Sequence, residues 1–567
     1  MKSYVELKSE LKKINRKPYP AYKGLKGVYR FETYTLYIDH VQGDPFAGPS
    51  SLHVVLSGKE SKIPTRLVEN EDKRTALADF CLRGFGREIG KYSFQAKGSG
   101  KSGLLSVSQC GQQVLKRSSC QIGPDGTVLL RFEVGFPANG RTINSIELEK
   151  ILFDFLPKAV KHSLVFTNMN EKIVEETLDL YEDQSALYDI CKEKGWVAFI
   201  ADGSVLPRKS GVSDKPMKEA KAFYAPESMR EEVVLPHKGH ISGMAIKKGI
   251  TLIVGGGYHG KSTLLNALET GIYHHIKGDG REYIAADETA FKVRAEDGRA
   301  ISGTDISMFI SDLPNKKNTE QFWTEDASGS TSQAANVAEA LVSGTKLLLM
   351  DEDTSATNFM VRDELMAQVI AKEKEPITPF LMRARELYES CGVSTVIVAG
   401  SSGAYFSVAD KIIQMDCYEA FDITGRVRKI CPLVTAKDVK EQELISKKER
   451  NLSIYPLERK KGQLKAKQYS KETFSIGKEN VELRGLEQLM DYEQTATLAH
   501  LLKYLLEQME KTGKKVTLEK QIEQVWKLYS EKGIEGVCQS EILPASFAQV
   551  RKQDFYACVN RYRGFRS

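Results

Sequence analysis

A glycine-rich segment between an apolar run and a helical pattern constrains the fold of this chain more than any other feature. The apolar run Ile250–Val254 predicts a buried strand, and Thr263–Leu268 predicts the start of a helix. Between them, Gly255–Ser262 reads Gly-Gly-Gly-Tyr-His-Gly-Lys-Ser and matches the pattern G-x-x-x-x-G-K-S at every position. A strand, this loop and a helix in succession predict a segment that wraps the phosphate groups of a nucleotide.

The residue types of this loop suit phosphate chemistry. Glycines allow backbone N–H groups to converge on phosphate oxygens, and the start of a helix adds positive potential. We expect Lys261 to bridge the terminal phosphates of ATP and Ser262 to hold Mg²⁺. His259 either bonds a phosphate or fills a variable position, and the second interpretation is favoured. The predicted nucleotide-binding residues are Gly255, Gly256, Gly257, Tyr258, His259, Gly260, Lys261, Ser262 and Thr263.

A pair of carboxylates downstream completes the predicted site. The apolar run Lys346–Met350 ends on Asp351 and Glu352. Hydrolysis of Mg-ATP requires a neutralised phosphate charge and a positioned water. We expect Asp351 to hold Mg²⁺ and Glu352 to polarise the attacking water, so Glu352 and Lys261 are the predicted catalytic residues. An acidic pair that only begins a turn is the alternative, and the complete phosphate loop upstream disfavours it.

A second stretch, Gly98–Ser102, imitates half of a phosphate loop. Gln95 stands where the first glycine belongs, and Leu104–Ser108 beyond it has a strand pattern instead of a helical one. We interpret it as a flexible basic turn without a nucleotide.

Length and composition exclude several classes of protein. The chain has 567 residues, 41% of them hydrophobic, and a net charge of +6. Sizeable cores are therefore expected, and no apolar run approaches the roughly 18 residues that span a bilayer. The beginning of the chain lacks the apolar core of a signal peptide. The nine cysteines form no Cys-x-x-Cys pair, which disfavours a zinc finger or a disulfide scaffold. We expect a cytoplasmic protein.

Two further segments indicate one class of nucleotide-binding protein. Asp353–Asn358 follows the acidic pair and resembles the D-loop of ABC ATPases, with Asn358 at the position of its last aspartate. Ala327–Gln333 opens a helical stretch and resembles a modified form of their signature L-S-G-G-Q. The resemblance implies that Ser328, Gly329 and Ser330 contact the γ-phosphate held by a second copy of the chain. It therefore implies two ATP molecules enclosed in a head-to-tail homodimer.

The residue sequences of several segments resemble those of one family in particular, the predicted ATPases of the ABC class. The segments that carry this resemblance are Asp39–Pro45, Gly278–Glu282, Arg294–Arg299, Ala327–Asn336 and Asp351–Phe359. The resemblance implies an α/β fold with an ABC-type P-loop NTPase core, an α+β N-terminal domain and a mainly helical C-terminal extension. The expected domains are residues 1–236, with a subdivision near 70–145, then 237–432 for the ATPase core and 433–567 for the extension. RNA binding has been associated with members of the family.

Three departures from the ABC pattern bear on turnover. After the apolar run Val393–Ala399 the chain reads Gly400-Ser401-Ser402, where ABC proteins place a switch histidine. Asp305 or Ser307 stands in the region of the Q-loop glutamine, and Tyr224 is the candidate for stacking on adenine. These differences predict secure ATP binding and slow hydrolysis.

Positive charge gathers after residue 446. Residues 447–471 hold nine basic residues against two acidic ones, with Tyr455 and Tyr469 among them and Phe474 just beyond. Basic groups mixed with aromatic rings suit single-stranded nucleic acid, and RNA is favoured over DNA here. The alternative interpretation of this basic stretch is a solvated linker. Lys97, Lys101 and the arginines at the end of the chain add further positive charge.

Three functions remain open on the sequence. The favoured one is a cytoplasmic ABC-type ATPase that binds and slowly hydrolyses Mg-ATP as a homodimer and couples this to RNA or another nucleic acid. The alternatives are an ATP-dependent regulator of a protein complex and an ATP-binding dimer with little turnover.

Overall fold

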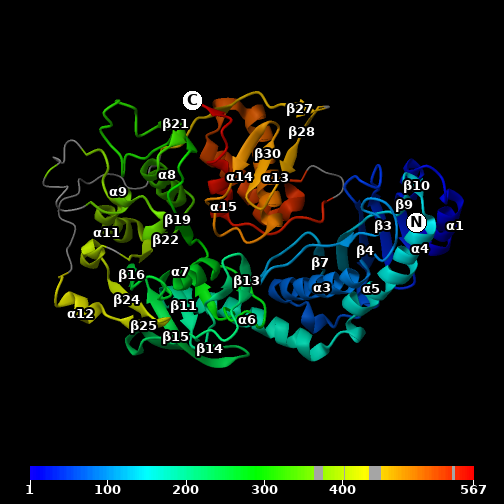
Figure 1. The fold of residues 1–567 in the computed structure, drawn as a ribbon, viewed down its shortest axis with the longest axis horizontal. Helices are drawn as coiled ribbons and strands as arrows, with labels where there is room; N and C mark the ends of the chain where they lie inside the picture. The colour runs from blue at the N-terminus through cyan, green and yellow to red at the C-terminus, as the bar shows by residue number, and fades with distance from the viewer. Residues whose placement is uncertain (363–368, 370–374, 401, 433–447, 461, 539–542) are drawn as a thin grey trace. The chain divides into compact units, whose positions relative to one another are not determined.

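The computed structural model describes residues 1–362, 369, 375–400, 402–432, 448–460, 462–538 and 543–567 (Figure 1). The chain forms two compact units. The first comprises residues 1–183 with 539–549, and the second comprises 184–538 with 550–567. Residues 184–236 thus belong to the same unit as the phosphate loop. The expected domain boundaries at 236/237 and 432/433 stay predictions.

The first unit is built on an antiparallel sheet in which β3 (Thr35–His40), β4 (Ser50–Leu56) and β8 (Val128–Val134) are neighbours. Buried and half-buried residues alternate strictly along β4 and β8, so one face of the sheet packs on the core. Helices α3 (Glu71–Tyr92) and α5 (Leu156–Leu164) pack on each other within this unit. The N-terminal region is therefore α+β, as the sequence predicts. Its sheet also contains β1 (Lys2–Ser3), β2 (Gly27–Arg30), β5 (Leu105–Ser106) and β7 (Cys120–Ile122), and α1 (Tyr4–Ile14) precedes β2.

The Gly98–Ser102 stretch in this unit is a tight turn with internal bonds. The Ser102 side chain is buried, and its hydroxyl donates to the Ser99 carbonyl at 2.5 Å and accepts from the Ala138 N–H at 3.0 Å. A position occupied in this way leaves the hydroxyl no role at a nucleotide.

The second unit contains a sheet of the order β19-β22-β23-β16-β24-β25. The three predicted apolar runs are confirmed as the adjacent strands β16 (Ile250–Val254), β22 (Leu347–Asp351) and β23 (Ser394–Val398). They pair in parallel, and nearly every residue in them is buried, as a sheet covered on both faces requires. The neighbours are β19 (Phe291–Val293), β24 (Lys411–Asp416) and the antiparallel edge strand β25 (Glu419–Asp422), with helices α7 (Lys261–Thr270), α8 (Gly329–Val342) and α11 (Phe380–Cys391) between the strands in sequence.

A second, antiparallel sheet of this unit has the order β14-β15-β11-β18. Its strands are β11 (Trp196–Ala201), β14 (Arg230–Leu235), β15 (Gly239–Lys247) and β18 (Ile284–Ala286). The segment 206–216 contains a short hairpin of β12 (Arg208–Ser210) and β13 (Ser213–Pro216). Arg208 at the start of this hairpin is paired with buried Asp279 at 2.8 Å, so the segment is bound to the sheet region.

The end of the chain is mainly helical and packs in the same unit (Figure 1). Helix α13 (Tyr492–Thr512) buries leucines at three- and four-residue spacing, which is the pattern of an amphipathic helix. It packs against α14 (Leu518–Lys532), α15 (Lys552–Val559) and a small sheet. That sheet consists of β29 (Ala466–Gln468), β30 (Thr473–Ile476) and β31 (Glu479–Glu482), and a separate pair joins β26 (Ser453–Ile454) to β32 (Phe565–Arg566).

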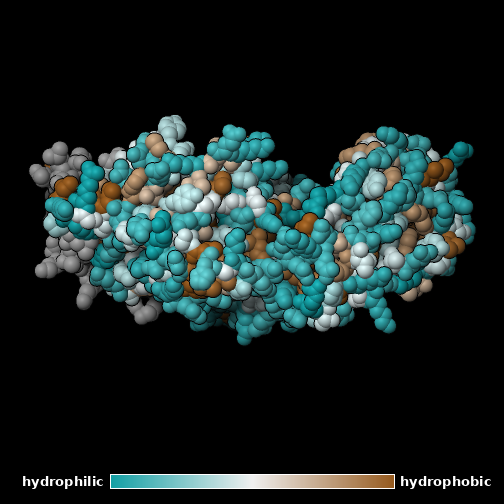
Figure 2. All heavy atoms as spheres, turned by 90° about the horizontal axis from the view of Figure 1, so that it is seen from below, coloured by the Kyte–Doolittle hydropathy of each residue, from teal (hydrophilic) through white to brown (hydrophobic). Residues whose placement is uncertain are grey.

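Among the described residues, no helix combines the length and apolar character that crossing a membrane demands. The face of the molecule in Figure 2 is mostly hydrophilic, with hydrophobic residues in scattered patches.

Candidate nucleotide site

The phosphate loop joins β16 to α7. Gly255 has φ of 145°, and a Cβ there would lie 2.2 Å from the Met415 carbonyl oxygen, so this position accepts only glycine. Gly260, with φ of 99°, caps α7. The Lys261 amino group donates to the Gly255 and Gly256 carbonyls at 2.7 and 2.8 Å. The lysine therefore curls over its own loop, where phosphate oxygens are the natural replacement for these carbonyls.

The acidic pair ends β22, which is separated from β16 by β23. Asp351 is buried and accepts from the Asp353 N–H at 3.1 Å. Glu352 accepts from the Gly400 N–H at 2.6 Å through Oε2. A Cβ on Gly400 would lie 3.8 Å from the Lys261 amino group and 3.9 Å from Glu352 Oε2. The structure thus brings the two predicted catalytic residues to the same point, just after β23.

The donor set at this point fits a nucleotide with its magnesium ion. Ser262 is exposed at the first turn of α7, and the Ser262 hydroxyl and the Asp351 carboxylate are oxygen ligands, which Mg²⁺ prefers. Ser262 and Asp351 would hold the ion, and the ion would neutralise phosphate charge. Tyr258 is fully exposed with φ of 63°, so its side chain points away from the loop's interior contacts.

Where ABC proteins place a switch histidine side chain, this chain offers a backbone N–H. Gly400 directs its N–H to Glu352, while Ser401 lies outside the described residues. The candidates for a Q-loop, Asp305 and Ser307, bond to each other, and both line a hollow together with Arg450.

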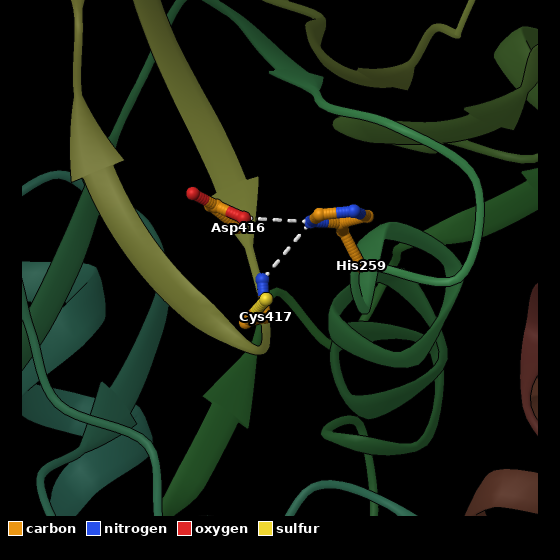
Figure 3. A group of neighbouring side chains, drawn as sticks. All are labelled: His259, Asp416 and Cys417. Carbon is orange, nitrogen blue, oxygen red and sulfur yellow. Dashed lines mark hydrogen bonds and ion pairs between the residues drawn. The ribbon is translucent and has the colours of Figure 1, made fainter.

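The β24–β25 hairpin contacts the phosphate loop directly (Figure 3). The Cys417 N–H donates to His259 Nδ1 at 3.0 Å, and the Tyr418 N–H donates to the His259 carbonyl at 3.1 Å. Asp416 Oδ1 lies 2.8 Å from the same imidazole nitrogen. His259 thus holds the hairpin to the loop through both its backbone and its side chain, a role that the sequence alone did not indicate.

Tyr224, the candidate for stacking on adenine, is on a segment that is bound to β25. Lys221 pairs with Glu419 at 2.6 Å, and the Ser228 hydroxyl donates to Asp422 at 2.7 Å. Tyr224 is 62% exposed between these two anchors. Since β25 belongs to the hairpin that contacts His259, the ring stands on an element linked to the phosphate loop.

The signature-like segment forms the first turn of α8. Ser328 is the N-cap residue and is exposed, and Gly329 is half-buried. Ser330 is buried, so only backbone atoms of that residue can face a ligand at this helix end. The open face of the turn consists of Ser328, Gly329 and Thr331.

The D-loop segment is held by the same helix. The Gln333 side chain donates to the Ser355 hydroxyl at 2.9 Å and accepts from the Ala356 N–H at 2.8 Å. Asn358, in the short helix α9 (Thr357–Met360), is exposed. One buried glutamine thus couples the first turn of α8 to the segment that follows the acidic pair.

A buried polar network behind α8 was missed by sequence reasoning. Glu296 accepts from the Asn336 side-chain amide at 2.9 Å and pairs with Arg561, and Arg299 pairs with Glu339. Burial alone would raise the pKa of Glu296, but the Arg561 and Arg299 guanidinium groups outweigh it and lower this pKa to about 2. From the sequence, the Arg294–Arg299 segment carried only a resemblance to the family, and Arg561 was only one of several terminal arginines. No local pattern connects residues 265 positions apart.

Much of the positive charge after residue 446 has acidic partners. Lys448 pairs with Glu320, Arg450 with Glu519 and Arg459 with Glu510. Lys447 and Lys461 lie outside the described residues. Exposed lysines remain on and beside β29, namely Lys465, Lys467 and Lys471. The terminal arginines are also engaged: Arg551 pairs with Asp554, Arg561 with Glu296, and Arg563 donates to the Glu325 and Gly298 carbonyls.

Comparisons with protein families agree with this architecture. The model of the N-terminal domain of ATPases of the ABC class matches residues 4–167, an ABC ATPase P-loop domain matches 170–451, and the MRB1590 C-terminal domain matches 465–567. The chain belongs to the ATPases of the ABC class and carries extensions on both sides of its P-loop domain. Binding of ATP is what this family membership implies for the site around Lys261.

Among individual relatives, an uncharacterised protein, MJ1628 of Methanocaldococcus jannaschii, is 32% identical over 252 residues, which is 42% of this chain and 54% of the relative. The match thus spans about half of the relative's length. Solved structures similar to this chain include cbiO1 of Clostridium perfringens, part of an ABC transporter complex, at 16% identity over 36% of this chain and 90% of that one, with a TM-score of 0.23. A metal-chelate type ABC transporter in an inward-facing conformation matches at 20% identity over 40% of this chain and 82% of that one, with a TM-score of 0.25.

Proposed function

We propose that this chain hydrolyses Mg-ATP with Glu352 as the residue that positions the attacking water. The observation that carries the proposal is the convergence of Lys261 and Glu352 on Gly400. Lys261 neutralises the transferring phosphoryl group, and Ser262 and Asp351 hold Mg²⁺. Tyr224 stacks on the adenine. Because Glu352 first has to release the Gly400 N–H, turnover is slow.

The proposed working state is a head-to-tail homodimer. The first turn of α8 leaves Ser328 exposed and Gly329 half-exposed. Because the start of a helix carries positive potential, this turn suits an anion such as a phosphate. In the dimer this turn meets the γ-phosphate bound to the partner subunit, and the exposed D-loop residue Asn358 lies at the same interface. ATP thereby completes the contact between two copies of the chain.

Phosphate release by the purified full-length chain, with and without Mg²⁺, tests this function. We expect Mg²⁺-dependent release in the wild type and almost none in Glu352→Gln. Light scattering should show Glu352→Gln as a monomer without nucleotide and as a dimer with ATP. Equal release by wild type and variant would instead favour an ATP-binding dimer with little turnover, which the Gly400–Glu352 bond also suits.

Single-stranded RNA is the proposed partner, bound through one tyrosine–cation pair at β29 and a second one at the β26–β32 pair. Lys467 lies 4.9 Å from the centroid of the Tyr469 ring, and Arg566 lies 3.6 Å from that of Tyr455. Both tyrosines are 53% exposed. Exposed rings beside cations provide stacking surfaces and phosphate partners together.

A labelled oligoribonucleotide titrated across a salt series tests this partner. We expect Lys467→Ala with Tyr469→Ala to weaken binding by about tenfold and to reduce the salt slope. Lys478→Ala is the matched control, since Lys478 on the neighbouring turn is already paired with Glu458. Absence of binding even at low salt would remove RNA and leave regulation of a protein complex as the coupled activity.

A further inference from the structure

The contact between the phosphate loop and the β24–β25 hairpin brings together three side chains of metal-ligating types. His259 Nδ1, one Asp416 carboxylate oxygen and Cys417 Sγ lie within 4.8 Å of one another (Figure 3). Nitrogen, oxygen and thiolate sulfur ligands in this number suit a Zn²⁺-like ion with a fourth position open to water. All three residues are at least partly exposed, so an ion can reach them.

The backbone holds these ligands in place under strain. Cys417 and Tyr418 form a two-residue turn in which both residues are left-handed, with φ of 47° and 67°. Such turns usually take Asn-Gly, because side chains larger than these disfavour positive φ. A cysteine and a tyrosine here indicate that the side chains matter more than the ease of the turn. The Tyr418 ring supports this reading, since it packs where a Cβ on Gly260 would stand.

His259 Nδ1 has two neighbours, the Cys417 N–H and the Asp416 carboxylate, and one of these two contacts is unfavourable whether or not Nδ1 carries a proton. Nδ1 accepts from the Cys417 N–H at 3.0 Å and also lies 2.8 Å from Asp416 Oδ1. If Nδ1 is unprotonated, its lone pair faces a carboxylate. If Nδ1 carries a proton, it has no lone pair left to accept from the Cys417 N–H, and two N–H groups face each other. A cation between Nδ1 and the carboxylate removes the repulsion of the first state.

We propose that His259, Asp416 and Cys417 form a binding site for a thiophilic divalent cation of the Zn²⁺ class. On binding, the Cys417 N–H gives up the Nδ1 lone pair and the Cys417 thiol passes its proton to solvent, so that the thiolate sulfur, the imidazole nitrogen and the carboxylate oxygen take the ion. Because His259 belongs to the phosphate loop, the ion fixes this loop to the hairpin. Metal binding and nucleotide binding then change each other's affinity by the same factor. The site is distinct from the Mg²⁺ position at Ser262 and Asp351.

Cobalt provides the test, because a thiolate ligand gives Co²⁺ a charge-transfer absorption that oxygen ligands do not. The reduced, metal-free full-length protein is titrated with Co²⁺ in the absence of nucleotide, and Zn²⁺ is added to displace it. We expect one equivalent of thiolate-bound Co²⁺ in the wild type. The absorption disappears in Cys417→Ser, and the affinity falls at least about tenfold in Asp416→Asn.

The matched controls are Cys431→Ser and Cys538→Ser, which remove other partly exposed thiols and should leave the titration unchanged. Circular dichroism verifies that Cys417→Ser is folded. A wild-type protein without thiolate-bound Co²⁺, or an absorption that persists in Cys417→Ser, would overturn the proposal. The titration needs no ATP, so its outcome is independent of the outcome for hydrolysis.

Discussion

The phosphate loop and the signature-like turn of α8 both begin a helix of the second unit, yet they are built in opposite ways. The loop depends on its glycine backbone and is joined to the distant β24–β25 hairpin at His259, and much of it is exposed. The turn of α8 is backed by a polar network of residues far apart in the chain, in which Glu296 accepts from the neutral Asn336 amide and pairs with buried Arg561. Function should therefore respond most to changes in the first region, and folding to changes in the second.

The largest effect is expected at the loop. Glu352→Gln removes the carboxylate charge that polarises water but keeps the shape and the capacity to accept from the Gly400 N–H. We predict that phosphate release falls by about 10²–10⁴-fold, the range for loss of a positioned proton acceptor. The melting temperature should stay close to that of the wild type. A large loss of stability in this variant would break the comparison, because it would give Glu352 a structural role.

The next effect concerns the turn. Arg561→Ala leaves Glu296 in a largely buried site without its closest cation, and we predict a loss of about 3–5 kcal/mol in the free energy of unfolding. Arg563→Ala is the matched control, because among the described residues Arg563 donates to the Glu325 and Gly298 backbone carbonyls instead of a carboxylate. Denaturant titrations of both variants provide the measurement. Equal losses of unfolding free energy in the two variants would show that the Arg561–Glu296 ion pair does not stabilise the fold more than the surface contacts of Arg563.

The same contrast explains what the sequence could predict. The strand, loop and helix around Lys261 are consecutive, so their residue types and spacing predicted both the local fold and the convergence with Asp351 and Glu352. The order β22-β23-β16 was not predicted from the three apolar runs and is a finding of the structure. ATP and Mg²⁺ binding at the named residues stays a prediction, as does the head-to-tail dimer.

The remainder depends on contacts that no spacing encodes. Arg561 was counted among the terminal arginines that add positive charge, but it is buried and paired with Glu296. His259 was assigned to a variable position, although its imidazole nitrogen receives the Cys417 N–H from a hairpin more than a hundred residues later. Ser330 was placed among ligand-facing residues, while helix geometry turns its side chain inward. Tertiary packing decides each of these cases, since local patterns record which residues are adjacent and omit which distant ones meet.

The far end of α7, the helix that follows the phosphate loop, is buried. Burial raises the pKa of Glu269 to about 7, against the pull of Lys292 at 3.7 Å. The folded pKa exceeds the unfolded value of 4.5, so the contribution of Glu269 to stability is complete below pH 4.5 and is lost as pH rises through 7. The loss is at most about 3 kcal/mol over this window.

Glu269→Gln should remove that part of the pH dependence. Unfolding free energies measured between pH 4.5 and 7.5 would then fall less steeply in the variant than in the wild type. Glu288→Gln, the same change at an exposed position, is the control and should follow the wild-type profile. Parallel profiles for all three proteins would show that Glu269 ionises without penalty, and that Lys292 compensates its burial fully.

The smallest predicted effect separates two serines within one turn. The buried Ser332 hydroxyl donates to the Gly329 carbonyl at 2.8 Å and accepts from the Glu296 N–H at 2.9 Å, whereas Ser328 is exposed. Ser332→Ala leaves the Glu296 N–H without its acceptor, and we predict a loss of about 1–2 kcal/mol in the free energy of unfolding. Ser328→Ala should change stability less and instead weaken the ATP-dependent association of Glu352→Gln chains. If Ser328→Ala proved the more destabilising of the two, the division between a ligand-facing and a structural side of this turn would be wrong, because the exposed hydroxyl would then serve the fold.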